Sequence, residues 1–274
     1  MNPYLPIRKV PLDYNGIGSS AFAVQMQHPE TGERLSEWKE AGVVGNSYML
    51  LSNEEVKNAA HQVAEECKID FVHDKTFFNG RNFVYSMKSQ HVAGEVKAGD
   101  DVALGMQFWN SYDGSKAFGF AMMLYRLICT NGMMSKDHFN TYRFKHEPKS
   151  EDWSKNLEQV VSNINNLVGG KDMKGRGRLD NLIANLRKLD ALDVTTAELG
   201  HIRHNYLQEI PVSIWGQIVD NFTNPLIVRE RINNHSGWDL LNAGTDLLWH
   251  KENPTVTTYG QNATIVDGLC RAVA

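Results

Sequence analysis

The sequence predicts an α+β fold, in which a helix and an antiparallel β-meander form a core that is followed by a mainly helical C-terminal half. Aromatic-rich runs in the first half are joined by turn dipeptides, and an amphipathic helical stretch precedes them. From about residue 150 the apolar residues recur with a period of 3.6 instead. We therefore expect a meander domain over residues 1–148 and a helical region over residues 149–274 packed on it.

The N-terminal forty residues contain one strand-like piece, "AFAVQMQ" (21–27), followed by the turn-like segment "HPETGERL" (28–35). The segment "VVGNSYMLL" (43–51) is rich in β-branched and aromatic residues, which favours an extended structure. Ser52 and Glu55 then have the spacing of a capping box, and apolar residues recur on one side of the helix predicted over residues 52–67.

Two hairpins are predicted to make the four strands of the meander. The first spans residues 69–89, and its turn Asn79-Gly80 is the dipeptide that type I′ turns favour. The second joins residues 100–112 to 117–129 through "DGSK". The stretch "LYRLICTNGMM" (124–134) predicts a last strand that runs into a helix, with Cys129 buried and the direction changing at Asn131-Gly132.

Period-3.6 patterns predict a first helix of the second half that is capped by Ser150 and ends at Gly169-Gly170. Further helices are expected over residues 179–189, 196–208, 212–222, 237–250 and 261–273, with Ser236 as the cap of the helix at 237–250.

Composition narrows the class of protein. The formal net charge is −4, so a basic surface has to be local. Cys67, Cys129 and Cys270 are odd in number and far apart, which favours a reducing compartment over a disulfide scaffold. Neither an apolar leader nor a membrane-spanning run is present, so we expect a soluble protein of the host cell cytoplasm with no membrane contact.

Catalytic and metal-binding motifs are absent: the sequence has no GxxxxGK[ST], HExxH, GxSxG or CxxC. His201 and His204 share a helix face but have no evident third metal ligand, and Asp100-Asp101 suits a solvated strand start. Asp113 has a structural reason to precede Gly114 in a turn. We therefore predict no cofactor, no metal and no enzyme; the weaker alternative is an active site formed by Asp113, His146 and Arg126.

Local charge points to nucleic acid. Residues 169–188 hold six basic and two acidic side chains among glycines, and cations are interleaved with the aromatic residues of the meander. Surfaces that bind single strands combine such cations with rings on which bases stack, a role for which Tyr85 and Tyr112 are the best placed. The candidate binding residues are Lys75, Arg81, Tyr85, Tyr112, Lys116, Arg126, Arg143, Lys145, Lys171, Lys174, Arg176 and Arg178. A solvated loop at 169–178 and an Arg126 paired with a carboxylate remain open alternatives.

A series of blocks resembles one family. "VVGNSYMLLSNEEV", "FFNGRNFVYSM", "FWNSYDGSKAF", "LYRLICTNGMM", "YRFKHEP" and the C-terminal "GWDLLNAGTDLLWHKE" are similar, in this order, to the phage- and plasmid-borne family called domain of unknown function 932. The resemblance spans roughly residues 40–260 and implies no catalytic residues.

The predicted order of helix, meander with a "DGS" turn, and helix also resembles the core of annealing proteins of the Red-beta, RecT and Erf type. That likeness implies a phage or mobile-element protein that binds and anneals single-stranded DNA in recombination or replication without nucleotide hydrolysis. It also implies a homo-oligomer, either a ring or a filament. The alternative is a non-enzymatic phage interaction protein, an anti-defence factor or assembly component, that binds a host protein.

Overall fold

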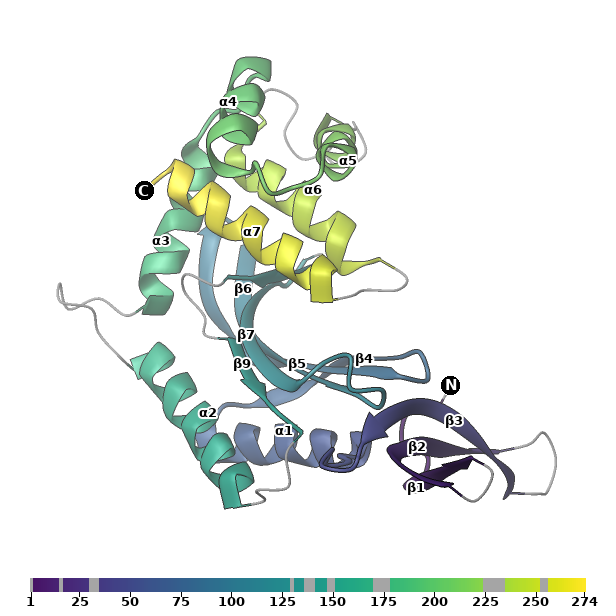
Figure 1. Ribbon diagram of the computed structural model, residues 1–274. Coiled ribbons are helices and arrows are strands. Elements are labelled where there is room, and N and C mark those ends of the chain that lie inside the picture. The colour runs from purple at the N-terminus through teal and green to yellow at the C-terminus, as the bar shows by residue number, and fades with distance from the viewer. Residues whose placement is uncertain are drawn as a thin grey trace. The chain divides into compact units, whose positions relative to one another are not determined.

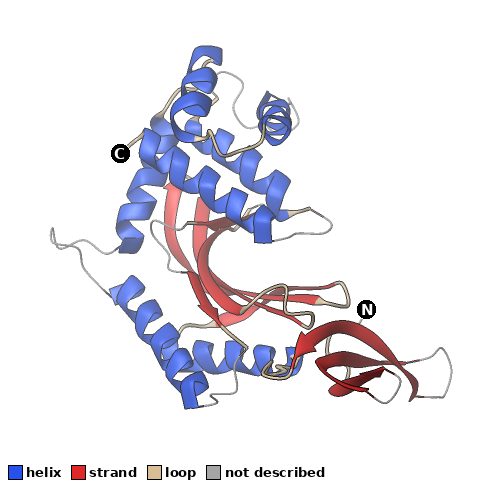
Figure 2. Ribbon diagram, in the orientation of Figure 1, coloured by secondary structure: helices blue, strands red, loops and turns tan. Residues whose placement is uncertain are grey.

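The computed structural model describes residues 2–14, 17–29, 35–128, 131–135, 141–146, 151–169, 178–223, 235–251 and 256–274. It confirms the α+β fold, with antiparallel sheets and a helical C-terminal half (Figure 2). The chain forms two compact units. Unit 1 comprises residues 1–87, 106–121 and 141–164, and unit 2 comprises residues 88–105, 122–140 and 165–274.

Unit 1 begins with an antiparallel sheet of β1 (Ile7–Tyr14), β2 (Ile17–Pro29) and β3 (Leu35–Gly45), in that order. The strand expected at 21–27 is confirmed within β2, and the pairing of Pro29 with Leu35 confirms a hairpin across the expected turn. The sequence patterns did not predict β1 or the first half of β3. One face of this sheet packs a small apolar cluster against Tyr112.

The predicted first helix is confirmed as α1 (Asn53–Cys67). Its capping box is complete, because Glu55 N donates to Ser52 Oγ (3.1 Å) while Ser52 N donates to Glu55 Oε2 (2.7 Å). The buried stripe from Val56 to Cys67 packs this helix on the sheet that follows, and the exposed side carries Glu54, Glu55, Glu65 and Glu66.

The predicted meander is confirmed as consecutive neighbours in a six-stranded sheet (Figure 1). Its strands are β4 (Phe71–Phe78), β5 (Asn82–Lys97), β6 (Asp100–Ser111), β7 (Phe118–Arg126), β8 (Asn131–Met134) and β9 (Thr141–Phe144). The β4–β5 turn differs from type I′, which needs two residues of positive φ. Gly80 has a φ of 92°, whereas Lys68 is the only non-glycine with positive φ in the described ranges.

The predicted helix after β7 is wrong, because Asn131–Met134 forms β8 and pairs antiparallel with β7, from Arg126↔Asn131 to Met123↔Met134. The Asn262 side chain holds the other edge of β8: Met134 N donates to Asn262 Oδ1 (2.9 Å), and Asn262 Nδ2 donates to Gly132 O (3.0 Å). Cys129 lies outside the described residues.

The predicted helices of the C-terminal half are confirmed. They are α2 (Glu151–Gly169), α3 (Arg178–Ala191), α4 (Thr196–Tyr206), α5 (Val212–Thr223), α6 (Gly237–Trp249) and α7 (Val256–Ala272). Ser236 caps α6 in a capping box with Asp239, whereas Ser150 lies outside the described residues. Among the described helices, none combines the length and the apolar character needed to cross a bilayer.

In unit 2, α6 and α7 run side by side and both contact β8 (Figure 1). The Trp249 ring of α6 lies directly over Gly132, where an added Cβ would stand 2.6 Å from the ring. Glycine is therefore required at this position of β8, and the close approach packs the helix pair onto the strand.

Candidate nucleic-acid interface

The tips of the two hairpins of the meander lie next to each other in unit 1. Tyr112 N, just beyond β6, donates to the carbonyl of Arg81 in the β4–β5 turn (2.9 Å). Ser115 Oγ in the β6–β7 turn lies within 3.4 Å of Asn82 Oδ1. Arg81 therefore stands beside the Asp113–Lys116 turn.

The Asp113–Lys116 turn is held by its own polar side chains. Ser115 N donates to Asp113 Oδ1 (3.0 Å), Gly114 adopts a φ of 70°, and Ser111 Oγ donates to Lys116 O (2.9 Å). Burial acts to raise the pKa of Asp113, but the hydrogen bonds from Ser115 and the charge of Arg81 outweigh it and hold that pKa below its usual value.

Strand β9 brings two more cations to the same end of the sheet. It pairs with β7 in the register Phe118↔Phe144 and Gly119↔Arg143. Extending this register by one residue places Lys145 opposite Ala117, next to Lys116. The side chains of Arg81, Arg143 and Lys145 are exposed, and that of Lys116 is partly buried. We call these four residues the tip rim.

The charge of the tip rim is local. Its four cations and the carboxylate of Asp113 together carry 4 − 1 = +3, in a chain of net −4. Burial lowers the pKa of Lys116, and the nearby Asp113 carboxylate acts against that shift. Arg81 and Lys116 lie in the turns that lead into β5 and β7, and Arg143 and Lys145 lie on and just beyond β9, so the four cations are spread across one end of the sheet.

The two tyrosines expected to stack on bases are buried, at 3% exposure for Tyr85 and 1% for Tyr112. The hydroxyl of Tyr112 accepts a hydrogen bond from Asn53 N (3.0 Å), and that of Tyr85 lies 3.0 Å from His61 Nε2. Burial raises the pKa of Tyr85 to about 12. Because neither ring has a face open to solvent, both residues fix α1 to the sheet and leave the candidate surface.

Arg126 pairs with a carboxylate. In unit 2 its Nε and Nη2 donate to the two oxygens of Asp100 (2.7 and 2.6 Å), and Trp238 Nε1 donates to the same carboxylate (2.8 Å). Burial acts to raise the pKa of Asp100, but these hydrogen bonds and the Arg126 charge lower it overall. Of the two alternatives for Arg126, the structure shows the pairing with a carboxylate, so we leave Arg126 out of the candidate surface.

The remaining candidate residues lie apart from the tip rim or cannot be placed. Lys75 is partly buried in the middle of β4 rather than at a tip, and burial lowers its pKa to about 8. Lys171, Lys174 and Arg176 lie outside the described residues, and Arg178 begins α3 with a side chain that is likewise outside them.

The residues of the alternative active site have structural partners. The ring of His146 stacks on Tyr48 at 4.5 Å, and its Nδ1 lies 3.0 Å from Met49 O, which can only accept, so Nδ1 carries the proton. Burial lowers the pKa of His146 and favours the neutral ring. No group of three or more potential metal ligands occurs within the described ranges; His201 instead contacts Asn205.

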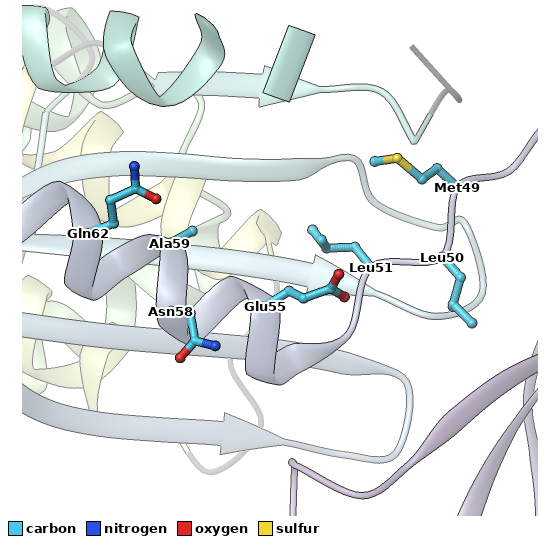
Figure 3. Close-up of a pocket in the computed structure, with 7 residues that line it drawn as sticks. All are labelled: Met49, Leu50, Leu51, Glu55, Asn58, Ala59 and Gln62. Atoms are coloured by element: carbon cyan, nitrogen blue, oxygen red, sulfur yellow. The ribbon is translucent and has the colours of Figure 1, made fainter. Parts of the chain in front are cut away.

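A pocket of about 450 Å³ opens beside α1 (Figure 3). The segment before α1 contributes Met49, Leu50 and Leu51, and α1 itself contributes Glu55, Asn58, Ala59 and Gln62. Leu51 and Ala59 are buried and form the apolar floor, whereas the three polar side chains are exposed. Sequence patterns did not predict the pocket, because these polar residues look like the ordinary solvent side of an amphipathic helix.

A family model described as domain of unknown function (DUF932) matches residues 40–202, which is more than half of the chain. The chain belongs to this family. The match confirms the resemblance and covers α1, the meander, α2, α3 and most of α4, whereas the C-terminal block that forms α6 lies beyond the matched DUF932 residues. No curated protein and no solved structure matches the chain.

Proposed function

We propose that this DUF932 chain is a non-enzymatic protein of a phage or mobile element that binds single-stranded DNA in the host cytoplasm and promotes annealing in recombination or replication. The observation that carries the proposal is the tip rim, where two hairpin turns and β9 bring Arg81, Lys116, Arg143 and Lys145 to the same end of one sheet. Cations spaced along a sheet end can track the phosphates of a strand that crosses it.

The cations of the tip rim are arranged to bind the phosphates of a nucleic-acid strand rather than a cluster of carboxylates on a partner protein. Three of the rim's side chains are exposed: Arg81 comes from the β4–β5 turn, and Arg143 and Lys145 come from β9 and the residue after it, so they can meet different phosphates along an extended strand. The exposed face of α1 carries four carboxylates, which repel phosphates and so favour a path of the sugar-phosphate backbone along the sheet end.

The test is fluorescence anisotropy with a labelled single-stranded oligonucleotide at low salt. We expect wild-type protein to bind, and the rim variant Arg81→Gln/Lys116→Gln/Arg143→Gln/Lys145→Gln to lose at least tenfold in affinity. The control variant Arg8→Gln/Lys39→Gln/Lys68→Gln/Lys251→Gln removes the same charge from exposed cations elsewhere and should bind like wild type. No binding by wild type at low salt would refute the proposal.

Self-association accompanies this proposal. Strand β4 is the terminal strand of its sheet and has no strand partner on its outer side within the described residues. An open edge of this kind pairs readily with another strand, and head-to-tail pairing between copies generates rings or filaments. Light scattering after size exclusion, with and without single-stranded DNA, tests it: a strictly monomeric protein under both conditions would refute self-association.

The second candidate is a non-enzymatic interaction protein that binds a host protein. The acidic face of α1, formed by Glu54, Glu55, Glu65 and Glu66, favours it, since such a face attracts a basic partner. A pull-down that recovers one host protein would identify the partner. If a Glu54→Gln/Glu65→Gln/Glu66→Gln variant bound that protein as tightly as wild type, this face would not be the contact.

A further inference from the structure

The pocket beside α1 has no role in the phosphate contacts of the tip rim, yet hydrogen bonds connect the pocket lining to the segment that follows the rim. Met49 N donates to the carbonyl of His146 (2.8 Å), and the His146 ring bonds Met49 O. Met49 lines the pocket, and Lys145 of the tip rim directly precedes His146. The tip rim is therefore one residue along the chain from His146, which bonds to a residue of the pocket lining.

The lining of the pocket selects against a phosphate. Among the described residues of the lining, the one charged side chain is Glu55, a carboxylate. The Oε2 of Glu55 accepts from Ser52 N and Ser52 Oγ (both 2.7 Å), whereas its Oε1 accepts no hydrogen bond from any described residue. That oxygen can accept from an N–H group of a ligand and repels an anion.

The other polar groups of the lining are the amides of Asn58 and Gln62. Asn58 has no hydrogen-bond partner within the described ranges, so it can offer both a donor and an acceptor. Gln62 Nε2 donates to Glu66 (2.8 Å), which leaves the Gln62 carbonyl as an acceptor. The buried side chains of Leu51 and Ala59 give a flat ring an apolar surface to lie on.

We propose that this pocket receives one unstacked nucleobase of the bound strand and favours a base that carries an exocyclic amino group. An apolar floor suits the flat ring, and the Glu55 carboxylate accepts from the amino group, the pairing that carboxylates make with N4 of cytosine. Thymine has no amino group, and its one donor on this edge, N3–H, lies between two carbonyl oxygens that the carboxylate repels. This inference rests on the proposed binding of single-stranded DNA.

The test compares two labelled oligonucleotides of about 16 nucleotides, the upper end of the footprint of one single-strand module. One is oligodeoxycytidylate and the other is oligothymidylate, measured at the same salt and neutral pH. Wild-type protein should bind the cytidylate about tenfold more tightly. Glu55→Gln and Asn58→Ala should each bring the ratio toward one and leave thymidylate affinity within twofold of the control variant Glu65→Gln.

The pocket variants are chosen so that the protein still folds. Gln serves as well as Glu at the third position of a capping box, so Glu55→Gln retains the cap of α1. Glu65→Gln removes the same charge from the same helix outside the pocket. Equal, tight binding of both oligonucleotides by wild type would overturn the pocket and leave the proposed function standing. A tenfold preference that survives both pocket variants would also overturn it, and absence of binding to either oligonucleotide would overturn both proposals.

Discussion

The backbone of Asp113 lies directly against Gly42: a Cβ built on Gly42 would stand 2.5 Å from Asp113 Cα and 2.8 Å from Tyr112 O. The tip of the β6–β7 hairpin is thereby seated on β3 of the N-terminal sheet. This contact explains why the turn is fixed, and the tip rim depends on a turn that holds Lys116 in place.

Gly42→Ala should therefore destabilise the protein. The methyl group meets backbone atoms, which cannot move without shifting the turn or the strand, so we expect a loss of about 1–3 kcal/mol in the free energy of unfolding. Urea denaturation measures it. Gly45→Ala is the matched control on the same strand, because an added Cβ there has no neighbour within 4 Å. Equal midpoints for the two variants would contradict the packing described.

Tyr112→Phe should separate stability from DNA binding. The change removes the hydroxyl that accepts from Asn53 N, so we expect a loss of about 1 kcal/mol in the free energy of unfolding. Because the ring is buried, affinity for a single-stranded oligonucleotide should stay within twofold of wild type. A large loss of affinity with unchanged stability would return Tyr112 to the binding surface.

Asp100→Asn should be strongly destabilising because it leaves the Arg126 guanidinium nearly buried, at 11% exposure, without its charge partner. The expected loss is about 3–5 kcal/mol, measured by chemical denaturation. Asp101→Asn is the neighbouring control, since Asp101 is not part of the pair. A small effect of Asp100→Asn would show that the ion pair is dispensable.

The same carboxylate predicts an acid dependence. Its folded pKa is below the unfolded value, so its contribution is present above about pH 4 and is lost as the pH falls through the folded pKa. Between pH 5 and pH 3, the difference in unfolding free energy between wild type and Asp100→Asn should shrink. A constant difference across this range would contradict the assignment.

Lys75 predicts a second pH dependence, at alkaline pH and in the same direction. Its folded pKa of about 8 is below the ordinary value of 10.5, so the unfolded chain binds more protons between these values. The free energy of unfolding of wild type should therefore rise relative to Lys75→Gln as the pH increases from 8 to 10.5. Guanidinium denaturation at several pH values measures the difference, and a falling difference would contradict the burial of this amine.

Much of the fold could be predicted from local patterns, since hairpin turns and helix caps depend on residues within a few positions of one another. Ser52 with Glu55 and Ser236 with Asp239 are such cases. Strand β8 could not be predicted in this way, because four residues carry no clear period and its outer edge is held by Asn262, far along the chain. Strand β1 contains Pro11, which argues against a strand unless it lies at a sheet edge, where the structure places it.

The candidate interface was predictable only in part. Exposed cations near turns were identified from local charge, and the sheet register then showed which of them share one end. Burial of Tyr85 and Tyr112 depends on α1, which contacts each hydroxyl from a distant part of the chain. The partner of Arg126 was equally out of reach, since Asp100 and Trp238 are brought together only by the fold.

The salt dependence of single-strand binding tests the central claim most directly. If the four cations of the tip rim each neutralise a phosphate, the slope of log affinity against log salt should be smaller in magnitude by roughly 3 in the rim variant than in wild type. The control variant should keep the wild-type slope. Equal slopes for wild type and the rim variant, measured by anisotropy across a salt series, would contradict the tip rim as the path of the strand.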